Sequence, residues 1–340
     1  MDVVVIGSGI GGFSFADEYR KLNPEARITL VTQESAGYYS RPLLSHGFTR
    51  EDIETRIVMR RFEDIESSGI HVLSNCEAMS IDRETRTVKV SHNGEATALP
   101  YDRLVLAQGS AALIPPPFVP YASLFKVLNS YSDLTELRRL RNEFLAAGPK
   151  PRWAIVGGGL IGCELASDLA TAGDDVTLFH ALPRLMERQL VEEDSAMLLK
   201  LLTEAQGVTV KLNENVQSFG GTAGQLTVKT AEGDYPGYQT IVIACGFKPR
   251  IDLAKSAGIA TGRGIRVNSL LATDDPNIHA IGDVAECADG RIYAYVTPIR
   301  SQAIWLAQFL AGKTETPWEA PAFKPKAKVH GFTAAHPYLF

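Results

Sequence analysis

Apolar positions along the chain alternate between short β-branched runs and longer stretches with helical spacing, and this order occurs twice. The first occurrence has an apolar run at 3–6, helix-forming residues at 13–22 and a second apolar run at 27–32. Residues 153–180 repeat it. Short β-branched runs next to glycine predict buried strands, and longer amphipathic runs predict helices. We therefore predict two strand–helix–strand units, which indicates an α/β fold with parallel sheets.

Alternating polar and apolar residues follow each unit and predict antiparallel hairpins. They occupy residues 70–100, with a turn signal at Asn93–Gly94, and residues 207–219 and 224–250. Further buried strands are predicted at 103–110 and 277–283, and helices at 134–148 and 301–312. The pattern thus predicts two Rossmann-like domains with inserted antiparallel hairpins.

Glycines in the first strand-to-helix turn have the spacing of a dinucleotide-binding loop. Gly7, Gly9 and Gly12 form G-x-G-x-x-G directly after the first strand, and Gly11 lies in the same turn. Such glycines allow a tight turn, the approach of a pyrophosphate and close helix–strand packing. Glu34 follows the second strand, where a carboxylate binds ribose hydroxyls, although Gln33 or Thr32 could occupy that position.

A second loop of the same kind occurs in the second unit. Gly157, Gly159 and Gly162 repeat the spacing, with Leu160 and Ile161 inside the motif. Two such loops suit an enzyme that holds two dinucleotides. The ribose position is taken here by His180 rather than by Asp or Glu, so the choice between NADH and NADPH stays open. Arg184 and Arg188 are either contacts for a 2′-phosphate or ordinary surface residues.

Composition narrows the class of protein. The 340 residues are 45% hydrophobic and carry a formal net charge of -5, which gives no reason to expect nucleic-acid binding. No run approaches the ~18 apolar residues that a membrane span needs, and the N-terminus does not have the composition of a signal peptide. We therefore expect a cytoplasmic protein. The cysteines show no CxxC or metal-site spacing, so we predict free thiols and no metal; they are Cys76, Cys163, Cys245 and Cys287.

Four sequence blocks in this order, "VVVIGSGIGG", "RLVLAQG", "IVGGGLIGCELASDL" and "ATDDPNIHAIGDVAE", resemble the FAD-dependent pyridine-nucleotide oxidoreductases of the glutathione-reductase fold. More narrowly, "YYSRPLLS", "RIDLAKSAGI" and "YVTPIRSQA" are similar to the NAD(P)H:rubredoxin reductase family. The resemblance implies an FAD-binding domain made of residues 1–112 and 245–317 and an NAD(P)H-binding domain at 113–244. Residues 318–340 would be a short remnant of a third, interface domain, which is largely missing and leaves the oligomeric state open.

The resemblance also implies roles for individual residues. Asp283 would bind the ribityl chain of FAD, although its alternative role is a helix N-cap. Arg41 and Glu164 would act beside the flavin and the nicotinamide, with a surface arginine and a surface carboxylate as their alternatives. Tyr295, whose alternative is core packing, and Thr297 would pass the flavin ring. The other positions implied to contact a cofactor are Pro42, Gly109, Gly246 and Gly282. His46 stands where related reductases have a lysine, so a Lys–Glu pair with Glu164 cannot be carried over.

The region that holds redox cysteines in disulfide-reducing relatives has none here. Residues 37–47 read "GYYSRPLLSHG". Without a thiolate, electrons cannot pass through a protein disulfide and must leave directly for a bound acceptor. Cys163, inside the second helix, is interpreted as a packing residue.

Together with the resemblance, these features imply an FAD enzyme that takes hydride from NADH, with NADPH as the alternative donor. It would reduce a small acidic iron protein, with rubredoxin as the first choice. The alternatives are a reductase of ferredoxin or flavorubredoxin, an NAD(P)H oxidase, or a regulatory flavoprotein like apoptosis-inducing factor. Lys324, Lys326 and Lys328 alternate, so in an extended segment they would share one face. This basic stripe would either dock an acidic carrier or belong to a tail that is disordered or merely solubilising.

Overall fold

A computed structural model describes residues 1–92, 94–148 and 150–339 of the chain. They form two compact units. The first unit comprises Met1–Ser40, Val58–Ala111 and Pro249–Phe323, and the second comprises Arg41–Ile57, Ala112–Lys248 and Lys324–Phe340. Among the described residues, no helix combines the length and the apolar character needed to cross a bilayer.

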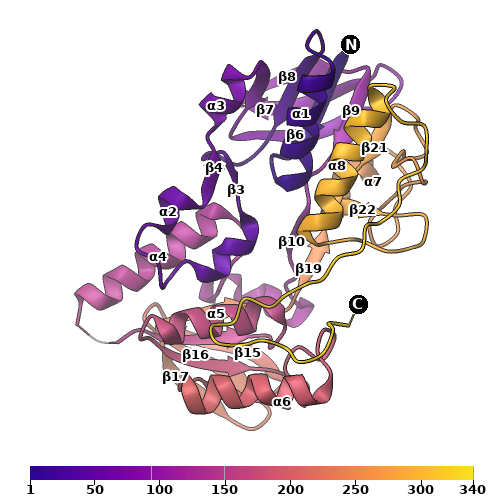
Figure 1. The fold of residues 1–340 in the computed structure, drawn as a ribbon. Coiled ribbons are helices and arrows are strands. Elements are labelled where there is room, and N and C mark those ends of the chain that lie inside the picture. The colour runs from indigo at the N-terminus through magenta and orange to yellow at the C-terminus, as the bar shows by residue number, and fades with distance from the viewer. Residues whose placement is uncertain (93, 149, 340) are drawn as a thin grey trace. The chain divides into compact units, whose positions relative to one another are not determined.

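The first unit is built on a five-stranded parallel sheet with the order β21-β9-β1-β2-β5. Helices α1 (Ile10–Leu22) and α8 (Val296–Leu310) lie side by side (Figure 1). Its central strand β1 is almost entirely buried, as β-branched runs in parallel sheets are. The strands of this sheet are β1 (Asp2–Ile6), β2 (Arg27–Val31), β5 (Ile70–Leu73), β9 (Arg103–Leu106) and β21 (Ile278–Ala280).

Smaller elements complete the first unit. An antiparallel sheet has the order β6-β7-β8. Its strands and the remaining elements are β6 (Cys76–Asp82), β7 (Thr87–His92), β8 (Glu95–Pro100), β3 (Tyr38–Tyr39), β4 (Val58–Arg60), α3 (Phe62–Ser67), α7 (Asp252–Ser256), β20 (Ile265–Arg266), the 3₁₀ turn η4 (Gly282–Val284) and β22 (Ala285–Glu286). The chain passes between the units after Ser40, Ile57 and Phe323. It also does so within β10 (Ser110–Ala112) and β19 (Phe247–Pro249).

The second unit repeats this plan with a parallel sheet of order β11-β18-β12-β13-β14 and an antiparallel sheet of order β15-β16-β17. The parallel strands are β11 (Lys126–Val127), β12 (Arg152–Val156), β13 (Asp175–Phe179), β14 (Thr209–Lys211) and β18 (Thr240–Ile243). The antiparallel strands are β15 (Val216–Thr222), β16 (Gln225–Thr230) and β17 (Asp234–Tyr238). The helices are η1 (Arg41–His46), α2 (Ile53–Arg56), η2 (Pro116–Leu124), α4 (Tyr131–Ala146), α5 (Leu160–Thr171), α6 (Glu192–Lys200) and η3 (Leu201–Ala205).

The predicted α/β fold with two Rossmann-like units and inserted antiparallel sheets is confirmed, but three strands expected in hairpins belong to the parallel sheets instead. β5 pairs with β2, β14 with β13, and β18 with both β11 and β12, always in parallel. Short alternating runs show that a strand forms but not which strand it pairs with. Of the predicted turn at Asn93–Gly94, Asn93 lies outside the described residues.

The C-terminal segment has no helix or strand between Lys324 and Leu339, yet it is tied to α5 and α6. His330 contacts Ser167 and Asp168 of α5, and Asp194 of α6 accepts hydrogen bonds from the backbone N–H groups of Ala335 and His336. The interpretation of this stretch as a disordered tail is therefore wrong for the described residues. Backbone hydrogen bonds to buried carboxylates fix it, and the sequence pattern does not reveal such contacts.

Candidate functional site

The first glycine loop connects β1 to α1 and leaves room for a ligand. Gly7 has φ +107°, and a Cβ there would lie 2.3 Å from the Ala107 oxygen. A Cβ on Gly12 would lie 1.8 Å from the Gly7 oxygen, whereas one on Gly9 would meet nothing within 4 Å. Gly12 therefore lets helix and strand pack, and Gly9 borders open space at the N-terminus of α1. Gly11 allows α1 to approach Ile299 of α8, because its Cβ would be 3.3 Å from the Ile299 Cγ2 atom.

Two carboxylates are placed within the same unit by short hydrogen bonds. Glu34 follows β2, and its Oε1 accepts a hydrogen bond from the Tyr39 hydroxyl at 2.7 Å. Asp283 lies inside η4, whose N-cap is Ile281, so Asp283 is not the cap of this turn. Its Oδ2 accepts a hydrogen bond from the Ser110 hydroxyl at 2.8 Å. Both side chains are thus held in fixed orientations beside the parallel sheet.

The remaining predicted flavin positions of the first unit lie at strand and helix ends. Gly109 follows β9 with φ +68°, and Gly282 follows β21 with φ +78°. Tyr295 is the N-cap residue of α8, its ring lies 5.2 Å from that of Phe323, and burial raises its pKa. Thr297 lies exposed in the first turn of α8. Arg41 and Pro42, in contrast, belong to η1 of the second unit, where the Arg41 guanidinium donates to the Asn129 oxygen at 2.8 Å.

The second glycine loop reproduces the first between β12 and α5. Gly157 has φ +116°, and a Cβ there would lie 2.4 Å from the Ala244 oxygen. A Cβ on Gly162 would lie 1.8 Å from the Gly157 oxygen, and one on Gly159 would meet nothing within 4 Å. Leu160 and Ile161 begin α5 and are partly exposed, and Gly246, with φ +110°, follows β18.

Both loops have the features that a dinucleotide pyrophosphate needs. Each offers helix N–H groups facing an open glycine, and neither α1 nor α5 has an acidic residue in its first turn to repel phosphate. The carboxylate of Glu34 follows β2 near the first loop, and His180 takes the corresponding position after β13 near the second loop. The residues present therefore fit two dinucleotides, as the sequence predicts.

Glu164 is a fully buried carboxylate of α5, so the interpretation as a helix-surface residue is wrong. Its Oε2 accepts a hydrogen bond from the Ser45 hydroxyl at 2.6 Å, and its Oε1 accepts one from the Lys328 backbone N–H at 2.8 Å. The Lys328 ammonium lies 3.3 Å from both oxygens. Because His46 stands where related reductases have a lysine, their Lys–Glu pair could not be carried over to Glu164. In this structure a lysine from the C-terminal segment, Lys328, supplies the cation instead.

Next to Glu164 lies a cluster that the sequence did not reveal. Potential ligand atoms of His46, Asp168 and His330 all lie within 4.8 Å of one another. The Asp168 carboxylate already accepts hydrogen bonds from the His330 ring at 2.8 Å, the Thr49 hydroxyl at 2.6 Å and the Phe48 N–H at 2.7 Å. Burial lowers the pKa of His46, although Asp168 and Glu164 oppose this shift. We interpret the cluster as the anchor of the C-terminal segment.

All four cysteines are free, as expected. Cys163 is fully buried, its thiol contacts the Gly158 oxygen at 3.3 Å, and burial raises its pKa. Burial also raises the pKa of Cys245 to about 11 and that of Cys287 to about 12. Raised thiol pKa values mean little thiolate at neutral pH, so these groups are poor redox nucleophiles.

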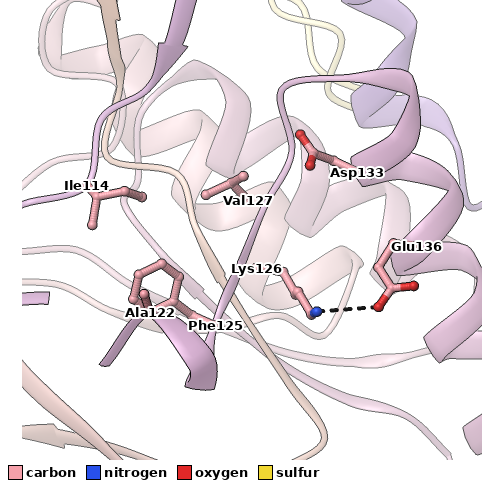
Figure 2. A pocket seen from close by; sticks show the side chains of 7 residues that line it. All are labelled: Ile114, Ala122, Phe125, Lys126, Val127, Asp133 and Glu136. Atoms are coloured by element: carbon pink, nitrogen blue, oxygen red, sulfur yellow. Dashed lines mark hydrogen bonds and ion pairs between the residues drawn. The ribbon is translucent and has the colours of Figure 1, made fainter. Parts of the chain in front are cut away.

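A pocket of the second unit lies apart from the predicted site residues. It is lined by Ile114, Ala122, Phe125, Lys126, Val127, Asp133 and Glu136 (Figure 2). The Lys126 ammonium pairs with the Glu136 carboxylate at 3.3 Å, and Asp133 completes the capping box of α4 with Ser130. The charged groups of this pocket thus serve the local structure.

Comparisons with known proteins agree with this geometry. A family model described as pyridine nucleotide-disulphide oxidoreductase matches residues 1–304. The rubredoxin-NAD(+) reductase of Acinetobacter baylyi is 35% identical over 315 residues, which are 92% of this chain and 79% of that protein. The nitric oxide reductase FlRd-NAD(+) reductase of Escherichia coli is 33% identical over 333 residues, 96% of this chain and 83% of that protein.

Solved structures give the same result. The ferredoxin reductase for the CYP199A2 system from Rhodopseudomonas palustris has a TM-score of 0.84 and 27% identity, and the match covers 95% of this chain and 78% of that one. An NAD-dependent persulfide reductase from A. fulgidus has a TM-score of 0.87 and 26% identity; the match covers 97% of this chain but only 62% of that one.

Proposed function

Because the chain belongs to the pyridine nucleotide-disulphide oxidoreductase family, we propose that it is an FAD-dependent enzyme. It takes hydride from NADH or NADPH and passes single electrons to a small iron protein, for which rubredoxin is the first candidate. FAD supplies the conversion between a two-electron donor and a one-electron acceptor. The single observation that carries the proposal is the pair of open glycine loops in a chain whose four cysteines are all free.

The two units divide the binding work in this proposal. The N–H groups at the start of α1 bind the FAD pyrophosphate, Glu34 its ribose and Asp283 its ribityl chain; the corresponding groups of α5 bind the nicotinamide dinucleotide. Arg41 stays a predicted contact of the flavin, to which its guanidinium would offer a positive charge. The remaining implied cofactor contacts, among them Pro42, Tyr295 and Thr297, stay predictions.

Glu164 acts in this proposal as a fixed negative charge near the nicotinamide. Its two oxygens accept hydrogen bonds from Ser45 and Lys328, so its orientation is set before the donor binds. Preorganised groups of this kind position a substrate without a reorganisation cost at the reaction step.

The absence of a redox-active thiol favours direct transfer to a carrier over disulfide reduction. The cysteine closest to a nucleotide loop, Cys163, has a thiol whose pKa is raised by burial. A disulfide relay needs a thiolate and a partner cysteine. The proposal also includes a cytoplasmic location, which suits free thiols.

Anaerobic stopped-flow mixing tests the proposal. NADH is expected to bleach the flavin. Oxidised rubredoxin, added in the next mixing step, is expected to be reduced by the bleached enzyme. Bleaching that is reversed only by oxygen would contradict the proposal and favour an oxidase or a regulatory flavoprotein. A flavorubredoxin reductase is the second candidate, because the E. coli relative is a FlRd-NAD(+) reductase; parallel assays with both carriers separate the two.

A further inference from the structure

The segment that follows β13 folds back onto the second glycine loop. The Met186 N–H donates to the Gly158 oxygen at 2.8 Å, and the Gly158 N–H donates to Nδ1 of His180 at 3.0 Å. A Cβ on Gly158 would lie 2.6 Å from a methyl carbon of Leu185 and 2.7 Å from the His180 ring. Gly158 therefore allows residues 180–187 to pack directly against the loop, and these contacts fix their position relative to it.

These hydrogen bonds determine the direction in which His180 donates. A backbone N–H can only donate, so Nδ1 of His180 accepts and the ring carries its proton on Nε2. Nε2 lies 3.1 Å from an oxygen of Glu187. His180 is 8% exposed, so this arrangement is shielded from water on the histidine side. The histidine thus holds the Glu187 carboxylate beside the end of β13.

Glu187 retains hydrogen-bonding capacity for a ligand. Its side chain is 23% exposed, and within the described residues its second oxygen has no hydrogen-bond partner. A carboxylate can accept several hydrogen bonds, and vicinal hydroxyls match two of them. In Rossmann folds, the end of the second strand is where a carboxylate meets the adenosine ribose.

We infer that Glu187, positioned by His180, binds the adenosine ribose diol of the nicotinamide donor and selects against a 2′-phosphate there. The inference rests on the proposed function, because it requires that the second glycine loop holds this donor. The strand-end position has no acid, so an acid seven residues further along takes over its role. A 2′-phosphate would bring negative charge against the fixed carboxylate.

Two arginines nearby do not provide an equivalent site for phosphate. Within the described residues, Arg184 and Arg188 make no hydrogen bond or ion pair, and Arg188 is exposed. Among the residues that the structure describes, no polar contact therefore holds either guanidinium at the end of β13, although Arg184 is half-buried, whereas two contacts in series hold Glu187 there. A preorganised group binds its ligand at a lower entropic cost than a mobile one. The donor preferred on these grounds is NADH.

Binding of nicotinamide-free fragments by the whole protein tests the inference without any electron acceptor. ADP-ribose and 2′-phospho-ADP-ribose are titrated by calorimetry. The unaltered protein is expected to prefer ADP-ribose, and Glu187→Gln is expected to reduce the ratio of the two affinities by about tenfold or more, since hydrogen bonds to a charged group and the repulsion are both lost. Glu187→Asp, which keeps the charge but shortens the reach, should give an intermediate ratio.

A matched control and a double variant separate ligand recognition from structural effects. Glu193→Gln removes one charge from an exposed position in the first turn of α6 and should leave the ratio unchanged. His180→Leu should reduce the ratio, and combining it with Glu187→Gln should reduce it no further, because His180 affects the discrimination between the two fragments only through Glu187. Loss of its contact with Gly158 would change both affinities alike. A merely structural histidine would alter both affinities equally.

Three results would overturn the inference: equal affinity of the unaltered protein for both fragments, an unchanged ratio in Glu187→Gln, or fully additive effects of the two substitutions. Failure to reduce rubredoxin would instead contradict the proposed function and leave these binding ratios as they are.

Discussion

The ammonium of Lys328 lies 3.3 Å from both oxygens of Glu164, which is fully buried in α5. The two residues are 164 positions apart in the sequence. The C-terminal segment therefore does more than follow α8 as a connector: it supplies the cation that compensates a buried carboxylate beside the second glycine loop.

Replacing Lys328 should lower the free energy of unfolding, because the buried carboxylate then loses its cation. Breaking a fully buried pair costs about 3–5 kcal/mol, and because the Lys328 side chain is 34% exposed we expect on the order of 2 kcal/mol for Lys328→Met. Urea unfolding measures the change. Lys324→Met, at an exposed position of the same segment, should have almost no effect. Equal losses in the two variants would show that the pair is unimportant.

Two glycines of the first loop should respond differently to the same methyl group. Gly12→Ala places a Cβ 1.8 Å from the Gly7 oxygen and should destabilise the protein even without cofactor. Gly9→Ala places a Cβ in open space at the start of α1, so the fold should survive while FAD retention falls. Thermal melting of apoprotein and the flavin content of purified protein give the two readouts. Loss of fold in both variants would contradict this division.

Cys163 should be dispensable for turnover. Its thiol is buried, and its raised pKa leaves it protonated near neutral pH. We expect Cys163→Ala to keep carrier reduction within about twofold while losing roughly 1 kcal/mol of stability from the small cavity. Steady-state kinetics and denaturation measure these. A large loss of activity with unchanged stability would instead indicate a redox role.

Acidification should weaken the first unit through His279, which is buried in β21 and whose Nδ1 has no hydrogen-bond partner within the described residues. Burial lowers its pKa to about 4, below the ordinary value of 6.5. As the pH falls, the unfolded chain therefore takes up this proton at a higher pH than the folded chain does. The contribution of His279 to stability is fully present above pH 6.5 and is lost as the pH falls toward 4.

At pH 4 the free energy of unfolding is expected to be lower by about 3 kcal/mol because of His279. His279→Gln cannot titrate, so its stability should depend less on pH between 6.5 and 4 than that of the unaltered protein. Melting curves at several pH values measure the difference. Parallel curves for the two proteins would rule out His279 as the source.

The basic residues of the C-terminal segment allow a test of carrier docking. Lys324 and Lys326 are exposed, whereas Lys328 is engaged with Glu164, so the stripe available to a partner is shorter than the sequence indicates. Changing Lys324 and Lys326 to Glu should lower the rate of rubredoxin reduction at low salt by about tenfold and leave flavin bleaching by NADH unchanged. Unchanged carrier kinetics would exclude docking at this stripe.

The glycine loops are the part of this protein that the sequence determines. Backbone approach at Gly7 and Gly12, and again at Gly157 and Gly162, tolerates no Cβ, so the residue types themselves reveal the strand–turn–helix geometry. Buried β-branched runs next to these loops predict the parallel sheets for the same local reason.

Only the tertiary structure decides the partners of isolated residues. Strand β18 pairs in parallel although its surroundings read as a hairpin, Lys328 reaches Glu164 from the far end of the chain, and Glu187 reaches the end of β13 through His180. A local pattern reports the conformation and burial of its own segment. Which charge meets which carboxylate depends on how distant segments pack, and no periodicity in the sequence records that.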